Sequence, residues 1–549
     1  MKKFGLKLLT AVIALLVAFL YYYITLPAFN IHSVGTWWFI LIALVVISTL
    51  LAIRKYAKEY KRTRNFAGAS IRISDISWKE LGIARFGYLL TGALLTILII
   101  GSILSSPIIN AKKYQQLMTV EERNFTEDIT PADFNTIPIL DKDSAALLGD
   151  RKMGSMVDMV SQFEVSYDYT QINVNDRPVR VTPLIYASPI KWLTNQSSGI
   201  PAYIKIDMAT QNTECVKLEE GIRYSKSEYF NRNIYRHLRF RYPTYIFADQ
   251  IFFEIDDDGV PYWICPVKKF NIGLFGGQTI GKVIICNAID GSSTVYDVDE
   301  VPTWVDKVYN AELLMELYDY NGTLKHGYFN SILGQRDCLQ TTNGYNYIAL
   351  EDDVWVYSGV TSVSGDQSNV GFVLMNQRTM ETRFYKIEGA IEDSAMSSAE
   401  GQVQHLGYQA TFPLLLNIAD EPTYFMALKD EAGLVKKYAM VNIQKYQWVA
   451  TGDTIKECEK AYSQLLANNG ISASETGLGQ EVSGTIKNMM SVNIEGNTHI
   501  YLTLEEKTTI FDIDLTKNEL IRIINYGIGD KIKLSYLEGE DPVTVTEIK

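Results

Sequence analysis

The sequence predicts a multidomain protein with three N-terminal transmembrane helices, duplicated α+β modules (an antiparallel sheet plus helix) and a small C-terminal β-barrel. Three observations predict it. Three long apolar stretches lie within residues 1–110, one series of strand and helix patterns occurs twice after residue 162, and the segment after residue 468 alternates apolar and polar side chains. A chain of 549 residues is also too long for a single hydrophobic core.

The predicted membrane domain, residues 1–110, rests on three apolar stretches. They read "LKLLTAVIALLVAFLYYYITLPAF", "VGTWWFILIALVVISTLLAI" and "FGYLLTGALLTILIIGSILSSPII". Each runs for about 20 residues without a charge in the apolar stretch, which as a helix crosses a hydrocarbon core of about 30 Å. Buried helices of soluble proteins rarely lack charge on every face, so three transmembrane helices are the better interpretation.

The positive charges around these stretches predict the orientation of the protein in a plasma membrane. The loop "NIHSVG" between the first two stretches has no Lys or Arg, whereas the flanks on the other side are basic. The basic residues are Lys2, Lys3, Lys7, Arg54, Lys55, Lys58, Lys61, Arg62, Arg64, Arg72, Lys79 and Arg85. The positive-inside rule therefore predicts a multi-pass protein with a cytoplasmic N-terminus and an extracytoplasmic chain after about residue 108. The first stretch could be a signal peptide, but no A-x-A-like site follows it, which favours an uncleaved anchor.

Charge divides the chain in two. Residues 1–109 hold 12 Lys+Arg and 3 Asp+Glu, a net of +9, so the remainder holds 39 and 60, a net of −21. Affinity for nucleic acid comes from clustered Lys and Arg, and the acidic part therefore argues against a nucleic-acid partner. The lipid bilayer is the partner that the sequence predicts directly.

The extracytoplasmic part divides into four predicted segments. A helical connector spans 111–162, copy 1 of the α+β module spans 163–320, copy 2 spans 321–468, and the β-barrel spans 469–549. In each copy, strand patterns precede a helix candidate, two further strand–turn–strand units and a closing helix.

Two similar phrases place the copies in register. "IKIDMATQNTECVKLEEG" begins at Ile204, and "VLMNQRTMETRFYKIEGA" begins at Val373. Thr210, Thr213, Lys217 and Glu219 then fall on Thr379, Thr382, Lys386 and Glu388. These are residue types that a β-hairpin needs at its turn and strand ends, so the phrase indicates repeated structure rather than repeated chemistry. Coincidence of common β patterns is the alternative.

Two resemblances follow from these stretches. A helix followed by "EIDDDGVPYWICPV" and "VIICNAIDGSSTVYDV" resembles a PepSY domain, and that resemblance implies an extracytoplasmic module for binding or regulation rather than turnover. The C-terminal pattern ending in "GIGDKIKLSYLEG" resembles an OB-fold, a scaffold that hosts many functions. The whole chain also resembles uncharacterised membrane proteins of Gram-positive bacteria.

Five cysteines, Cys215, Cys265, Cys286, Cys338 and Cys458, all fall in the extracytoplasmic part. They show no metal-ligand spacing and are interpreted as buried small hydrophobic residues. Cys265 and Cys286 lie on successive predicted strands, so a disulfide between them stays an open alternative.

Motifs that could carry chemistry have simpler interpretations. Asp256, Asp257, Asp258 and Gly259 form a hairpin-turn pattern, because the twelfth position of a calcium loop would be Val267. "GLFGGQTIG" lacks the Lys-Ser/Thr of a phosphate loop and is predicted to be a hairpin loop. The five histidines are scattered, although a triad assembled from distant segments stays possible. The sequence predicts no catalytic residue, metal site or cofactor.

One basic stripe is a candidate anion-binding site. Arg232, Arg236 and Arg239 share a helical face, Arg241 follows them, and the matching helix of copy 2 lacks these arginines. A solvated or salt-bridged face is one interpretation. The other is a site for an anionic envelope polymer or a lipid headgroup.

The sequence leaves three functions open. The first is a membrane-anchored extracytoplasmic protein with a non-catalytic binding, scaffolding or regulatory role in the cell envelope, acting on an envelope protein or an anionic polymer. The second is an envelope hydrolase or glycopolymer-modifying enzyme with its site between the two copies. The third is a transporter or channel subunit, which spans without charged residues support poorly.

Overall fold

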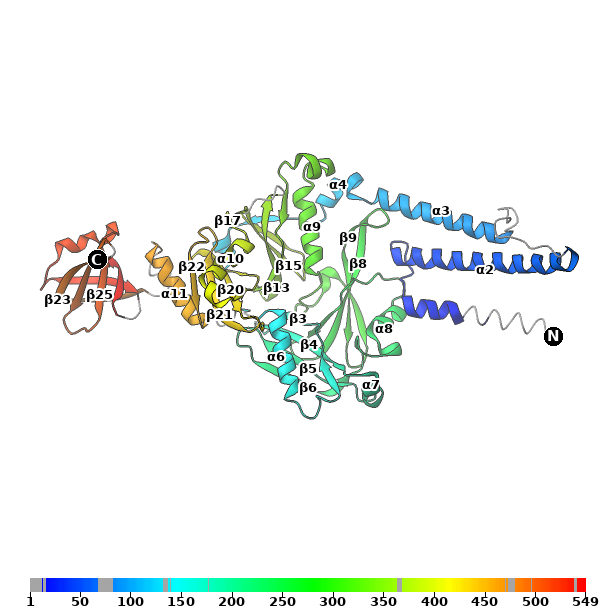
Figure 1. The fold of residues 1–549 in the computed structure, drawn as a ribbon, viewed down its shortest axis with the longest axis horizontal. Helices are drawn as coiled ribbons and strands as arrows, with labels where there is room; N and C mark the ends of the chain where they lie inside the picture. The colour runs from blue at the N-terminus through cyan, green and yellow to red at the C-terminus, as the bar shows by residue number, and fades with distance from the viewer. Residues whose placement is uncertain are drawn as a thin grey trace.

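The computed structural model describes residues 12, 16–67, 82–131, 137–138, 140–175, 177–362, 368–469, 471, 479–494, 496–537 and 541–549. Figure 1 shows an elongated molecule with long helices at one end, a group of sheets in the middle and a small β unit that holds the C-terminus at the other end.

Two described helices are long and apolar enough to cross a membrane. The apolar part of α2 (Val34–Ala67) covers Val34–Ala57, and α3 (Ile83–Leu104) is apolar throughout. The first predicted span lies partly outside the described residues, and its described part includes the shorter apolar helix Leu16–Thr25. The basic loop between α2 and α3 also lies partly outside them, at residues 68–81.

The ends of the apolar helices contact the tip of one β-hairpin. The Ser105 hydroxyl, next to the end of α3, accepts hydrogen bonds from the backbone N–H groups of Leu274 (2.9 Å) and Phe275 (3.2 Å). The His32 ring, between the first helix and α2, lies 2.8 Å from the Leu274 carbonyl oxygen. After Ser105 the chain continues into α4 (Pro107–Gln115), where the Tyr114 hydroxyl donates to the Ser105 carbonyl at 2.7 Å. The predicted loop "GLFGGQTIG" is this hairpin tip.

Four antiparallel sheets follow one another along the chain. The first sheet contains β2 (Phe163–Val165), β3 (Thr170–Val174), β4 (Arg177–Tyr186), β5 (Ile200–Asp207) and β6 (Thr213–Ile222). The second contains β7 (Phe252–Ile255), β8 (Pro261–Ile272), β9 (Gly276–Asn287) and β10 (Ser293–Asp297).

The third and fourth sheets have the same order. The third contains β11 (Leu339–Thr341), β12 (Asn346–Leu350), β13 (Asp353–Ser362), β15 (Gly371–Asn376) and β16 (Thr382–Tyr385). The fourth contains β18 (Gln409–Ala410), β19 (Leu414–Ile418), β20 (Glu421–Lys429), β21 (Val435–Asn442) and β22 (Val449–Gly452). Between them, β14 (Ser368–Asn369) pairs with β17 (Gly389–Ala390).

All four sheets share one plan. A helix precedes each sheet, the first strand is broken in two, and three further strands follow as a meander. Both parts of the broken strand pair with the second strand, as β2 and β3 do with β4, β11 and β12 with β13, and β18 and β19 with β20. In the second sheet the first part of the broken strand is a single bridge between Phe247 and Val267, and β7 is the second part. The preceding helices are α6 (Lys142–Gly154), α8 (Ile234–Arg241), α9 (Ala311–Thr323) and α10 (Glu392–Gln402). Each predicted copy therefore holds two sheets of this plan, and the repeating unit is about half as long as a predicted copy.

The phrase that recurs in the sequence is the β5–β6 hairpin in one place and the β15–β16 hairpin in the other. The Asp207 carboxylate accepts the backbone N–H of Thr210 at 2.8 Å, and the Asn376 side chain accepts that of Thr379 at 2.9 Å. Both turns close on a residue with positive φ, Gln211 (61°) and Met380 (66°). The turn between β9 and β10 uses Asn287 in the same way. The predicted register of the threonines agrees with the two hairpins.

Each half of the part that holds the four sheets has its own core, and a third core joins the halves. In β13, Trp355 and Tyr357 face the core of the second half, whereas Val356 and Val360 face the joining core. This division follows from the period of two in a strand. The joining core also includes one face of β9 and much of α9, so the central strands are buried on both sides.

The predicted connector 111–162 contributes to both halves. Its short strand β1 (Glu121–Arg123) pairs in parallel with β16, and Phe125 of α5 (Phe125–Asp128) lies in the core of the second half. By contrast, α6 contributes Ala145 and Met153 to the core of the first half. This segment therefore crosses from one half to the other.

The C-terminal part follows α11 (Ile455–Asn468), which begins with a capping box between Thr454 and Glu457. Five strands form a closed barrel in the order β23–β24–β25–β27–β26, with a separate core. They are β23 (Gly479–Ile494), β24 (Asn497–Leu504), β25 (Ile510–Asp514), β26 (Lys531–Leu537) and β27 (Val543–Ile548). The predicted linker before the barrel lies partly outside the described residues, at 470 and 472–478.

Candidate functional site

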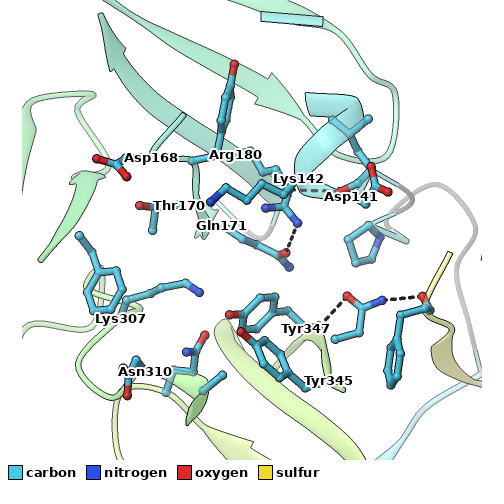
Figure 2. Close-up of a pocket in the computed structure, with 18 of the residues that line it drawn as sticks. Asp141, Lys142, Asp168, Thr170, Gln171, Arg180, Lys307, Asn310, Tyr345 and Tyr347 are labelled. Atoms are coloured by element: carbon cyan, nitrogen blue, oxygen red, sulfur yellow. Dashed lines mark hydrogen bonds between the residues drawn. The ribbon is translucent and has the colours of Figure 1, made fainter. Parts of the chain in front are cut away.

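A pocket of about 610 Å³ lies where the four sheets meet, and we call it the junction pocket (Figure 2). Each sheet contributes residues from its first strand or from the break in it. These are Asp168, Tyr169, Thr170 and Gln171 from the first sheet, Gln250, Ile251, Phe252 and Phe253 from the second, Tyr345, Asn346 and Tyr347 from the third, and Thr411, Phe412 and Leu414 from the fourth. The shared plan of the sheets therefore creates the pocket, because the breaks expose backbone and side chains at one place.

Arg180, in β4, is a buried cation that lines this pocket. Only 6% of the surface of Arg180 is exposed. The guanidinium donates to the Leu140 carbonyl at 3.1 Å and to the side-chain oxygen of Gln171 at 3.3 Å. Gln171 is also the cross-strand partner of Arg180 in the β3–β4 ladder. Burial lowers the pKa of Arg180, although a guanidinium stays charged in proteins.

Lys307 is a second buried cation in the pocket, with 5% of its surface exposed. It lies in the irregular segment before α9. The Glu254 carboxylate accepts its backbone N–H at 3.0 Å, and the backbone carbonyl of Gln377 accepts the next two N–H groups, those of Val308 and Tyr309. Its ammonium lies 3.9 Å from the centre of the Tyr347 ring. Burial, followed by the nearby charge of Arg180, lowers the pKa of Lys307 to about 7.

Two buried acids lie behind Lys307. Glu254, in β7, accepts the backbone N–H groups of Asp306 and Lys307, and Asp306 accepts the backbone N–H of Asn173 at 2.6 Å. Burial raises the pKa of both carboxyl groups, and their mutual repulsion raises that of Asp306 further. At neutral pH this pair therefore carries less negative charge than two exposed acids would.

The acids that line the pocket itself have other partners. Asp168 pairs with Lys226 at 2.9 Å, Asp141 pairs with Lys429, and Glu312 accepts the Tyr345 hydroxyl at 2.8 Å. An ion pair requires a nitrogen–oxygen distance of 4.0 Å or less. Within the described residues, no carboxylate oxygen lies that close to the guanidinium of Arg180 or the ammonium of Lys307. The two buried cations thus face the pocket without a direct ion pair, although Glu254, Asp306 and Glu312 lie near enough to Lys307 to raise its pKa in part.

Two buried amides also leave polar atoms without a hydrogen bond. They are the side-chain Nε2 of Gln171 and the side-chain Oε1 of Gln377, in residues with 2% and 1% of their surface exposed. An unpaired buried amide atom costs roughly 1–3 kcal/mol, so such atoms in a pocket wall point to a missing partner. The site can therefore offer a donor next to Arg180 and an acceptor from the opposite wall.

The predicted basic stripe does not form one continuous face. Arg232 donates to the Gln196 carbonyl, and Arg236 lies 4.8 Å from the centre of the Tyr23 ring. Arg239 is buried, donates to the carbonyls of Tyr242 and Tyr245, and covers the Phe247 ring at 4.1 Å. Arg241 is exposed. Arg236 thus lies where α8 meets the first apolar helix, the other arginines lie apart from it, and anion binding by them stays a prediction.

The other candidates from the sequence have structural places. Cys265 and Cys286 are free and buried on paired strands, and burial raises the pKa of both thiols. Asp256 accepts the N–H groups of Asp258 and Val260 in the β7–β8 turn, which Gly259 closes with a φ of 81°. Among the described residues, no group of three His, Cys, Asp or Glu side chains could hold a metal ion.

The residues of the junction pocket were not predicted from the sequence. The segment from Val301 to Gly322 was expected to be one helix, but α9 begins at Ala311, and Lys307 lies in the irregular part before it. Arg180 stands in the strand pattern "VRVTPLIY", and nothing in that pattern marks it as a site residue. One signal could have revealed it, because strands buried on both faces leave no exposed position for a charge.

A scan of protein-family models finds no match to this chain, and a search of the curated proteins finds no relative.

Proposed function

We propose that this chain is a membrane-anchored extracytoplasmic protein that binds a component of the cell envelope in the junction pocket. The observation that carries the proposal is a pocket lined by all four sheets in which two buried cations form no direct ion pair with the described residues. Buried charge without a partner is costly, and proteins keep such groups mainly where they have a function. The role is non-catalytic, and binding serves scaffolding or regulation in the envelope.

The repeated plan of the sheets supports the PepSY-like interpretation. We infer that residues 163–320 and 321–468 are copies of one module, and that each copy contains two sheets of the shared plan, the second of them with its preceding helix, α8 or α10, in a unit that resembles a PepSY domain. The closed barrel after α11 fits the OB-like interpretation in its number of strands. The PepSY-like resemblance favours binding over turnover, whereas an OB-like barrel is compatible with either.

An envelope hydrolase or glycopolymer-modifying enzyme with a site between the copies is the second candidate. The position of the junction pocket would suit it. However, the described lining contains no serine, cysteine or histidine for a triad. Its three acids, of the kind a glycosidase uses in pairs, are already bound to other side chains: Asp141 to Lys429, Asp168 to Lys226 and Glu312 to Tyr345. Binding is the function that this lining supports better.

We further propose three spans, with the N-terminus in the cytoplasm and the sheets outside the plasma membrane. In a variant without the native cysteines, we expect Lys460→Cys, on exposed α11, to react with a membrane-impermeant maleimide in intact cells. Arg54→Cys, at the far end of the apolar part of α2, reacts only after the cells are permeabilised. Labelling of Arg54→Cys in intact cells would contradict this topology.

Ligand binding in the junction pocket can be tested with a residue at its rim. Gln250 is exposed and lines the pocket, so Gln250→Trp covers the opening without changing a core, and Gln250→Ala leaves it open. The full chain, purified from its own membranes, is examined by native mass spectrometry. We expect a bound small molecule on the natural protein and on Gln250→Ala, and its loss from Gln250→Trp. Equal occupancy of all three proteins would refute binding at this site.

A further inference from the structure

We propose that the junction pocket is an anion site, which holds the carboxylate or phosphate group of a small organic ligand between Arg180, Lys307 and the side-chain amide of Gln171. This inference rests on the proposed function and adds the chemical class of the ligand. The charge of the ligand would supply the direct ion pair that the two cations lack.

The geometry provides a complete set of contacts for such a group. Arg180 and Gln171 face each other across the β3–β4 ladder, and the free Nε2 of Gln171 is a donor beside the guanidinium. Lys307 comes from the opposite side, as Figure 2 shows, where the Glu254 carboxylate and the Gln377 backbone fix its main chain. Donors that converge from two sides and are already held in place lose little entropy when an anion binds.

The rest of the ligand would meet a mixed surface. Phe252, Phe412 and Tyr345 offer aromatic area, and the unpaired Oε1 of Gln377 offers an acceptor for a hydroxyl or amide hydrogen. A volume of about 610 Å³ suits a ligand of the size of a small organic metabolite or a short polymer end. The ligand class is therefore an anion with an apolar or hydroxyl-bearing body.

The test uses the full chain in nanodiscs of phosphatidylcholine, which carries no net charge. Thermal unfolding is followed during titration with sodium phosphate, sodium acetate or sodium chloride at equal ionic strength. A ligand that binds only the folded state raises the unfolding temperature. We expect an increase with phosphate, with acetate or with both, beyond that with chloride. Phosphate alone indicates a phosphorylated ligand, and acetate alone indicates a carboxylate.

Variants separate this site from anion effects elsewhere. Lys307→Met and Gln171→Met each remove one contact, and loss of a charge-assisted hydrogen bond weakens binding about 10- to 100-fold. Lys460→Met removes an exposed charge from α11 and should change nothing. The inference is wrong if neither phosphate nor acetate raises the unfolding temperature of the natural protein more than chloride does. It is also wrong if Lys307→Met and Gln171→Met show the same rise as the natural protein. If the anion titration fails but Gln250→Trp still loses the native ligand in mass spectrometry, the pocket binds a ligand that is not an anion. The proposed function then stands, and only the anionic class of the ligand is wrong.

The affinity should also depend on pH. Sulfate is the suitable probe, because its charge is constant between pH 6 and 8. Lys307, with a pKa of about 7, loses its proton in this range, and we expect sulfate to bind about tenfold more weakly at pH 8 than at pH 6. The titratable and charged groups around it are Arg180, Glu254, Asp306, Glu312, Tyr345 and Tyr347, with Asp141, Lys142, Asp168 and Lys226 at the pocket wall. Ionisation of Glu254 or Asp306 at higher pH also weakens sulfate binding. Lys307→Met should remove most of the pH dependence of the affinity.

Discussion

Replacing Lys307 by methionine should stabilise the ligand-free protein. The ammonium is buried and has no carboxylate within ion-pairing distance in the described chain, so the folded state bears the cost of its desolvation. Methionine retains the apolar part of the side chain against Tyr347 and Phe252 without that cost. Replacement of buried charge by apolar side chains of similar size stabilises proteins by up to about 1–4 kcal/mol. Thermal unfolding of the full chain in nanodiscs measures the gain.

The gain should be largest at low pH. Because the pKa of Lys307 is lowered from 10.5 to about 7, the unfolded chain binds more protons than the folded protein between these values. Stability of the natural protein therefore rises with pH from about 7 to 10.5, and the advantage of Lys307→Met shrinks over the same interval. Lys460→Met, the exposed control, should shift the unfolding temperature little at any pH. A destabilised Lys307→Met would show that Lys307 has a structural role instead.

Replacing Trp355 by alanine should have the largest destabilising effect. Trp355 is fully buried in β13, its indole N–H donates to the Leu350 carbonyl at 2.9 Å, and the Arg383 guanidinium covers its ring at 4.4 Å. Truncation of a buried tryptophan to alanine costs roughly 3–5 kcal/mol because it leaves a cavity. Denaturant unfolding of the full chain measures the loss.

A control for this variant is available in the same half. Leu434 lies in the turn before β21 with 39% of its surface exposed, and Leu434→Ala should change stability by less than about 0.5 kcal/mol. The barrel has its own core, so its trypsin resistance should survive in Trp355→Ala. Equal stability of the two alanine variants would mean that Trp355 does not organise the core of the second half.

Local patterns made much of the fold predictable. The β7–β8 and β9–β10 hairpins follow from alternating strands around Asp256–Gly259 and Asn287–Gly291, whose side chains and glycines specify tight turns. The two-residue turns at Glu351–Asp352 and Ala419–Asp420 carry no glycine, yet all four residues adopt positive φ. The ladder registers on either side determine those turns, and a single sequence does not reveal registers.

The pocket residues could not be predicted for a related reason. Arg180 and Gln171 are neighbours in the first sheet, but Lys307 reaches the same pocket from the irregular segment before α9, and no spacing along the chain encodes that meeting. The predicted basic stripe shows the converse case. Its helical spacing was visible, but burial of Arg239 against Phe247 depends on the loop that folds over α8. Periodicity predicts elements, whereas sites between elements depend on tertiary packing.

The hairpin of β8 and β9 has a mechanical consequence. One end pairs with β7, whose Phe252 and Phe253 line the junction pocket, and the other end is bonded to Ser105 at the end of α3. Twelve residues of extended β8 cover about 40 Å, and a two-stranded ladder of this length bends far less easily than a loop. The hairpin therefore connects the wall of the junction pocket to the end of α3 through one continuous ladder.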